Sequence, residues 1–151
     1  MFRHCFDYIC HWLVSHSRHG THSPFVYKLV DEVIYAYQAR VPERVSGIKP
    51  AKINALINRL LEFWLKEPNE VRDYVLIDAE ENYLVAFNQL LPKTHQGTLC
   101  IFRGIYLNTA QRAAWKTLIN RDEVRVSIDL YYIGLIFFRE GQAKENFKIR
   151  F

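Results

Sequence analysis

The residues with the most obvious capacity for chemistry are crowded at the start of this sequence. Five of the six histidines and two of the three cysteines lie within the first 22 residues. Zinc sites use these residue types, but they are usually built from tight pairs such as C-x₂-C or H-x₃-H. We therefore interpret the crowding mainly through packing, capping and solvent exposure. The remaining candidate metal ligands are His19 and His22.

Other catalytic constellations are weaker still. No serine lies in a G-x-S-x-G turn, and Cys100 falls in the middle of an apolar run that is typical of a buried strand. The six glycines are never closer than seven residues, which excludes both the G-x-G-x-x-G and the G-x-x-x-x-G-K phosphate-binding loops. The sequence thus contains no phosphate-cradling loop of either kind.

The apolar spacing predicts which elements must position these residues. Apolar residues recur at helical spacing in three early segments, and short apolar runs alternate with helical patterns after residue 72. Ser23-Pro24 and Asn108 with Gln111 are typical helix starts. We predict helices over 2–17, 23–38, 50–66, 80–91 and 108–120, and strands over 73–78, 97–102, 124–130, 135–139 and 147–151.

This element order predicts an α/β fold, in which N-terminal helices precede a reduced, mixed, Rossmann-type sheet of about four or five strands flanked by helices. We divide the chain into an N-terminal helical segment, 1–49, and a shortened α/β domain, 50–151, which together form one compact unit. The residues of 124–130 alternate between apolar and polar, as expected for a half-buried strand.

Composition excludes several classes of protein. The 151 residues are 50% hydrophobic and 24% charged, with a net charge of +4, which is typical of a globular domain. No apolar run approaches the length of a membrane span, so we expect no membrane as a partner. Three cysteines without metal-ligand spacing indicate reduced thiols in a cytoplasm. The basic residues of the last third alternate with apolar residues, as on a solvated face, so we do not expect nucleic acid as a partner.

Two parts of the sequence resemble a known family. The segment RHGTHSPFV at residues 18–26, followed by an amphipathic helix, is similar to the N-terminal signature of a bacterial group of class I S-adenosylmethionine-dependent methyltransferases. The strands and helices from residue 73 to the end resemble the closing elements of the same group, in the same order. The resemblance covers about two-thirds of the chain and implies S-adenosylmethionine as the family cofactor.

The departures from this family decide the functional expectation. Between residues 45 and 72 the family would place three strands, a glycine-rich turn and a ribose-binding acid, whereas this chain has one helix. Arg103 and Gly104 stand where related metal-dependent enzymes have acidic residues. Asp78 remains as the candidate cofactor-binding residue, although it could instead cap the following helix.

We therefore expect a methyltransferase-like protein that has lost the S-adenosylmethionine-binding loop and acts as a non-catalytic interaction or regulatory module, with no cofactor. The alternative is an S-adenosylmethionine-dependent methyltransferase whose cofactor site is completed by a partner chain.

The sheet order should be 73–77, 97–102, 135–139, 124–130, with the first pair parallel and the last antiparallel. Loss of the preceding strands leaves 73–77 at an edge. The apolar faces of the helices at 2–17 and 50–66 exceed what so small a sheet needs. We therefore predict a homodimer that buries these helices, and a protein partner is also possible.

Overall fold

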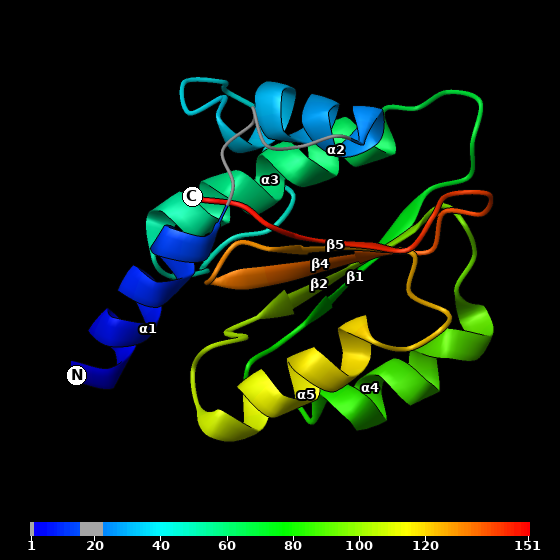
Figure 1. The fold of residues 1–151 in the computed structure, drawn as a ribbon. Coiled ribbons are helices and arrows are strands. Elements are labelled where there is room, and N and C mark those ends of the chain that lie inside the picture. The colour runs from blue at the N-terminus through cyan, green and yellow to red at the C-terminus, as the bar shows by residue number, and fades with distance from the viewer. Residues whose placement is uncertain (1, 16–22) are drawn as a thin grey trace.

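The chain folds into three layers around one mixed sheet. The computed structural model describes residues 2–15 and 23–151, with side chains from Tyr8 onward. Helices α2 and α3 lie on one face of the sheet, and α4 and α5 lie on the other (Figure 1). The helical elements are α1 (Phe2–Val14), α2 (Pro24–Leu29), the π-helical turn η2 (Val30–Ile34), α3 (Ala51–Leu65), α4 (Tyr83–Leu90), the 3₁₀ turn η3 (Leu91–Lys93) and α5 (Thr109–Ile119).

Polar side chains fix where three of the helices begin. Ser23 accepts a hydrogen bond from Val26 N ahead of Pro24, and Asn108 accepts one from Gln111 N at 2.8 Å, which confirms both predicted starts. Helix α4 begins at Tyr83, later than the predicted residue 80. The reason is that the Asn82 side chain, and not an earlier residue, accepts from the first free amides of that helix.

The second helix is shorter than the predicted 23–38. It passes from α2 into η2 and ends at Ile34. Arg59, a buried residue of α3, donates from Nε to Val33 O at 3.0 Å and from Nη2 to Ile34 O at 3.5 Å. These bonds satisfy carbonyls that another helical turn would otherwise have used, so the tertiary contact ends the helix.

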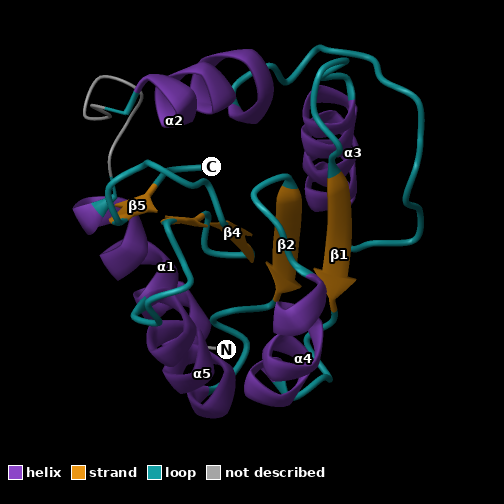
Figure 2. Cartoon of the chain, turned by 90° about the vertical axis from the view of Figure 1, so that its right-hand side faces the viewer, coloured by secondary structure: helices purple, strands orange, loops and turns teal. Residues whose placement is uncertain are grey.

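The sheet has the predicted order. Its strands are β1 (Asp73–Ile77), β2 (Thr98–Arg103), β3 (Val126–Asp129), β4 (Ile133–Phe137) and β5 (Glu145–Lys148), arranged β1-β2-β4-β3-β5. β1 and β2 run parallel with Val75 opposite Cys100, and β3 and β4 run antiparallel. β1 therefore lies at one edge of the sheet, beside β2 in Figure 2. The α/β class and the reduced five-stranded mixed sheet are confirmed.

The last strands start earlier than the periodicity indicates. β4 begins at Ile133 and not at 135, because a very tight turn joins it to β3. In that turn Leu130 N donates to Ile133 O at 3.0 Å, and Tyr132 N donates to Leu130 O at 2.9 Å. Tyr131 takes the rare positive φ of 69° between them. β5 is likewise shifted toward the N-terminus from the predicted 147–151 and pairs in parallel with β3.

The prediction that the 124–130 strand is half-buried was wrong. All four residues of β3 are buried, including the polar Ser127 and Asp129. β3 lies between β4 and β5, and helices cover both faces of the sheet. The polar residues of the alternation make internal hydrogen bonds, such as that from Ser127 Oγ to Asn146 Oδ1 at 2.7 Å.

Two apolar cores hold the layers together. Val26, Leu60 and Leu135 belong to the core between α2, α3 and the sheet, so the N-terminal helices and the strands share one interior. The other core lies beneath α4 and α5, where Trp115 packs so closely on Gly134 that a Cβ there would lie 2.5 Å from the indole ring. None of the helices in the described part of the chain combines the length and apolar character that a bilayer crossing requires.

Candidate functional site

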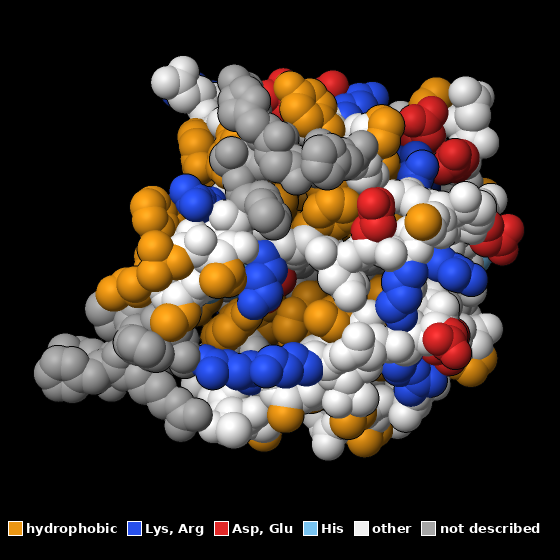
Figure 3. Space-filling view, viewed as in Figure 1, with side chains coloured by type: hydrophobic (Ala, Val, Ile, Leu, Met, Phe, Trp, Pro, Cys, Tyr) orange, Lys and Arg blue, Asp and Glu red, His pale blue; other side chains and the backbone are white. Residues whose placement is uncertain are grey.

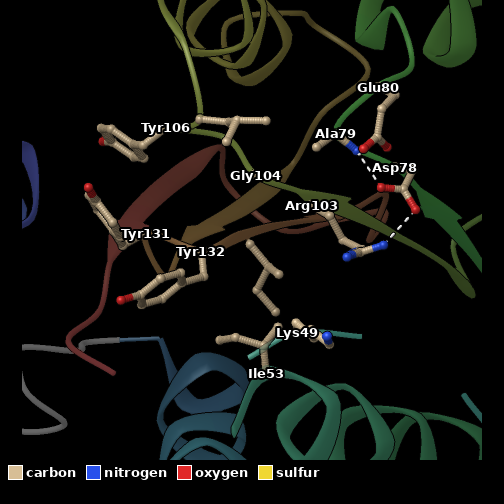
Figure 4. A pocket seen from close by; sticks show the side chains of 12 residues that line it. Lys49, Ile53, Asp78, Ala79, Glu80, Arg103, Gly104, Tyr106, Tyr131 and Tyr132 are labelled. Carbon is tan, nitrogen blue, oxygen red and sulfur yellow. Dashed lines mark hydrogen bonds and ion pairs between the residues drawn. The ribbon is translucent and has the colours of Figure 1, made fainter. Parts of the chain in front are cut away.

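A pocket of about 340 Å³ opens at the carboxyl ends of β1 and β2. Parallel strands of open α/β sheets place ligand-binding crevices at this end. The pocket lies between the loop that follows β2 and the start of α3 (Figure 4). Its lining residues are Lys49, Ile53, Asp78, Ala79, Glu80, Arg103, Gly104, Tyr106, Leu107, Tyr131, Tyr132 and Ile133.

An ion pair joins the ends of the two parallel strands. Arg103 Nη1 lies 2.5 Å from Asp78 Oδ2, and Ala79 N donates to Asp78 Oδ1 at 2.8 Å. Partial burial raises the pKa of Asp78, but the hydrogen bonds from Ala79 and with Glu80, together with the Arg103 charge, outweigh it, so the pKa lies below its ordinary value. Asp78 is therefore ionised at neutral pH and is a weak proton acceptor.

Side chains of α4 and α5 hold the loop that carries Asp78 and the end of β2 by hydrogen bonds. The buried Gln111 amide donates to Ala79 O and, at 3.1 Å, to Glu81 O. Tyr83 Oη donates to Arg103 O, and burial raises the pKa of that phenol. Gly104 has a φ of 71°, and a Cβ there would lie 2.8 Å from the Ala79 Cβ. A side chain at position 104 would thus push the two loops apart.

Tyrosines form the wall farthest from the ion pair. The rings of Tyr106 and Tyr131 stack at 4.9 Å and 17°. The Arg112 guanidinium lies 5.0 Å from the Tyr106 ring centroid, and Lys52 Nζ lies 4.7 Å from that of Tyr132. Cations of the protein itself thus cover one face of each of these two rings.

A buried carboxylate connects this wall to α1. Asp129 accepts from Tyr106 Oη at 2.8 Å and from Tyr131 N at 3.0 Å. His11 Nε2 lies 2.8 Å from Asp129 Oδ1. His11 is 4% exposed and Asp129 is 4% exposed, so this pair is shielded from water. The pair therefore fixes α1 and the β3–β4 turn relative to each other.

Of the three predicted site residues, the structure describes only Asp78. Asp78 lines the pocket, and its carboxylate accepts from the adjacent Ala79 amide, while Asn82 caps the helix. His19 and His22 lie outside the described residues. Among the side chains that the structure describes, 8–15 and 23–151, no group of three or more His, Cys, Asp or Glu residues could hold a metal ion. Cys100 is fully buried, and this burial, with the Asp73 charge, raises the pKa of its thiol to about 12, so it is a poor nucleophile.

Sequence reasoning missed several residues that the fold brings together. His11 and Asp129 are 118 positions apart, and no local pattern indicates that they pair. Asp129 belongs to the polar set of an alternating strand, and that pattern suggested a solvent-facing residue. Lys49 precedes a helix without belonging to any motif, yet it reaches the pocket.

Comparison with known protein families, with curated proteins and with solved structures finds no match to this chain.

Proposed function

We propose that this chain is a shortened relative of the bacterial class I S-adenosylmethionine-dependent methyltransferases that serves as a non-catalytic interaction module. The observation that carries the proposal is the 2.5 Å ion pair between Arg103 and Asp78 at the ends of β1 and β2. In this ion pair the Asp78 carboxylate is occupied by the Arg103 guanidinium. The metal-dependent methyltransferases that this chain resembles would have an acidic residue at the position of Arg103.

The region before β1 also supports the loss of the cofactor site. S-adenosylmethionine needs backbone amides for its carboxylate and an acidic residue for its ribose hydroxyls. Residues 51–65 form α3, and its apolar face, including Leu56, Leu60 and Trp64, is buried in the core of the chain itself. This segment therefore fills one layer of the fold, which supports the proposal that the cofactor cradle has been lost.

Calorimetric titration tests this proposal directly. We expect S-adenosylmethionine and S-adenosylhomocysteine to bind no tighter than about millimolar, since the lining amides of Ala79 and Gly104 already donate to Asp78 Oδ1 and Tyr132 O. A micromolar dissociation constant, with NMR shifts centred on Asp78, would contradict the proposal. If that binding also disappeared in a monomeric variant, the alternative of a methyltransferase completed by a partner chain would take its place.

We also propose that the interaction module is a homodimer formed through α1. Ile9, Trp12 and Leu13 lie on one face of this helix at i, i+3 and i+4, and they are 49%, 48% and 64% exposed. Hydrophobic side chains gather over α1 on the face shown in Figure 3. The apolar face of α3, in contrast, is buried within the chain. Of the two helices whose apolar faces the sequence predicts to lie in the dimer, only α1 therefore keeps an exposed apolar face.

Light scattering at micromolar concentration should give about twice the chain mass of 18.0 kDa. Leu13→Asp should restore the monomer mass, because it places a charge in the centre of an apolar contact. Val85→Asp is the matched control, since Val85 is a 52% exposed apolar residue on α4, and this variant should remain dimeric. A monomeric parent protein, or equal effects of the two variants, would remove α1 as the interface.

The thiols of Cys10 and Cys100 are free, which agrees with a reducing compartment. We accordingly propose a cytoplasmic location. Fractionation of cells that express a tagged chain would test it, and recovery with secreted proteins would contradict it.

A further inference from the structure

We propose that the pocket at the ends of β1 and β2 binds a small monoanion, a carboxylate carried on a single planar ring, with the carboxylate between Lys49 and Arg103. This inference rests on the proposed function, because it gives the module a ligand that it holds without reaction. It assigns to this pocket a ligand class that neither the sequence patterns nor the resemblance indicates.

The size and lining of the pocket select a small, mostly apolar ligand. Its volume of about 340 Å³ lies at the lower end of the range of roughly 300–1,000 Å³ for small-molecule sites. Ile53, Leu107 and Ile133 supply aliphatic surface, and Tyr132 adds an aromatic side (Figure 4). One ring of six atoms with a short substituent suits this space better than a nucleoside or a larger cofactor.

Two cationic side chains on opposite sides of the pocket determine where the carboxylate of the ligand would lie. Figure 4 shows Lys49 entering from the α3 side and Arg103 from the end of β2. One end of the Arg103 guanidinium binds Asp78. Among the described residues, neither the other nitrogens of that guanidinium nor the Lys49 ammonium has a hydrogen-bond or ion-pair partner. A carboxylate placed between them would accept from both groups.

Two further features restrict the charge of the ligand. Asp78 and Glu80 line the same end of the pocket, so a dianion such as a phosphate ester would be repelled more than a monoanion. An organic cation is also disfavoured, because Arg112 and Lys52 already lie over Tyr106 and Tyr132. The tyrosine side of the pocket therefore suits the uncharged ring of the ligand and is unsuited to a positively charged group.

The pocket is held in shape before any ligand arrives. Gln111 fixes the loop of Ala79, and the stacked Tyr106 fixes Tyr131, whose φ of 69° is rare for a bulky residue. A preformed site loses little conformational entropy when a ligand binds. We therefore expect measurable affinity even for a molecule of the smallest suitable size.

Benzoate is the probe for this site, and neutral benzamide is its charge control. Titration followed by heteronuclear NMR should give a dissociation constant of about 1 mM for benzoate, a reasonable value for a ligand of this size. The largest shifts should fall on Lys49, Gly104 and Ile133. Benzamide should bind at least fivefold more weakly. Equal binding of the two probes, or benzoate shifts that fall elsewhere on the protein, would overturn the proposal.

Two lysine variants then test the cation. Lys49→Met keeps the aliphatic chain and should weaken benzoate at least fivefold, whereas Lys93→Met, at an exposed lysine remote from the pocket, should leave the affinity within twofold. Arg103→Lys keeps a charge beside Asp78 and should weaken benzoate less than Lys49→Met, so it provides a second measurement if either variant melts early. Unchanged affinity in Lys49→Met would refute the assignment. Tight binding of S-adenosylmethionine would instead contradict the proposed function, and it would do so whatever benzoate does.

Discussion

Trp64→Ala should lower the free energy of unfolding by about 4 kcal/mol, the largest effect that we expect from one substitution. Trp64 is 1% exposed, and its ring packs against Phe137 at a centroid distance of 5.2 Å. Its indole Nε1 donates to Asp73 O at 3.0 Å and to Gly97 O at 3.1 Å. One side chain thus joins α3 to the starts of β1 and β2, and its removal leaves both a cavity and two carbonyls that lose a donor.

Urea denaturation monitored by circular dichroism would measure this loss. Trp64→Phe is the control that separates the two contributions, because it keeps most of the ring and removes the indole N–H. We expect it to cost about 1–2 kcal/mol, the sum of a lost hydrogen bond and a smaller cavity. A loss below about 2 kcal/mol for Trp64→Ala would mean that the neighbouring aromatic residues collapse into the space, and the role assigned to Trp64 would then be wrong.

Asp129→Ala should lower the free energy of unfolding by about 3 kcal/mol. Substitution removes the acceptor of His11 Nε2, Tyr106 Oη and Tyr131 N, all within 3.0 Å of the carboxylate. A buried donor left without its acceptor typically costs about 1–3 kcal/mol, and this substitution affects three such groups. Because His11 belongs to α1, we also expect this helix to lose much of its protection against amide hydrogen exchange.

A neighbouring residue provides the matched control. Ser127 is buried on the same strand and makes one side-chain hydrogen bond, to Asn146 at 2.7 Å. Ser127→Ala should cost about 1 kcal/mol and leave the exchange rates of α1 unchanged. If Asp129→Ala and Ser127→Ala destabilised the protein equally, or if α1 exchanged at its parental rate in both, the network would not be what holds this helix.

The sequence by itself determined the elements and their order. Ser23 and Asn108 bring the side-chain acceptor that a helix start needs, so the beginnings of α2 and α5 are local properties of the chain. The short apolar runs before and after α4 predicted β1 and β2, and a helix-length connection between them requires parallel pairing. The glycine spacing by itself also excludes the two glycine-rich phosphate-binding loops. These inferences rest on interactions within a few residues, which the sequence displays directly.

Only the tertiary structure decided which polar residues are buried and which meet one another. Asp129 and Arg125 follow the same polar alternation, yet Asp129 is buried and Arg125 is exposed, because α1 covers only the first of them through His11. The pairing of Asp78 with Arg103 joins two strand ends 25 residues apart, and Lys49 reaches the same pocket from the start of a third element. Such contacts depend on how the layers pack in space, and packing brings together residues whose separation along the chain carries no periodic signal.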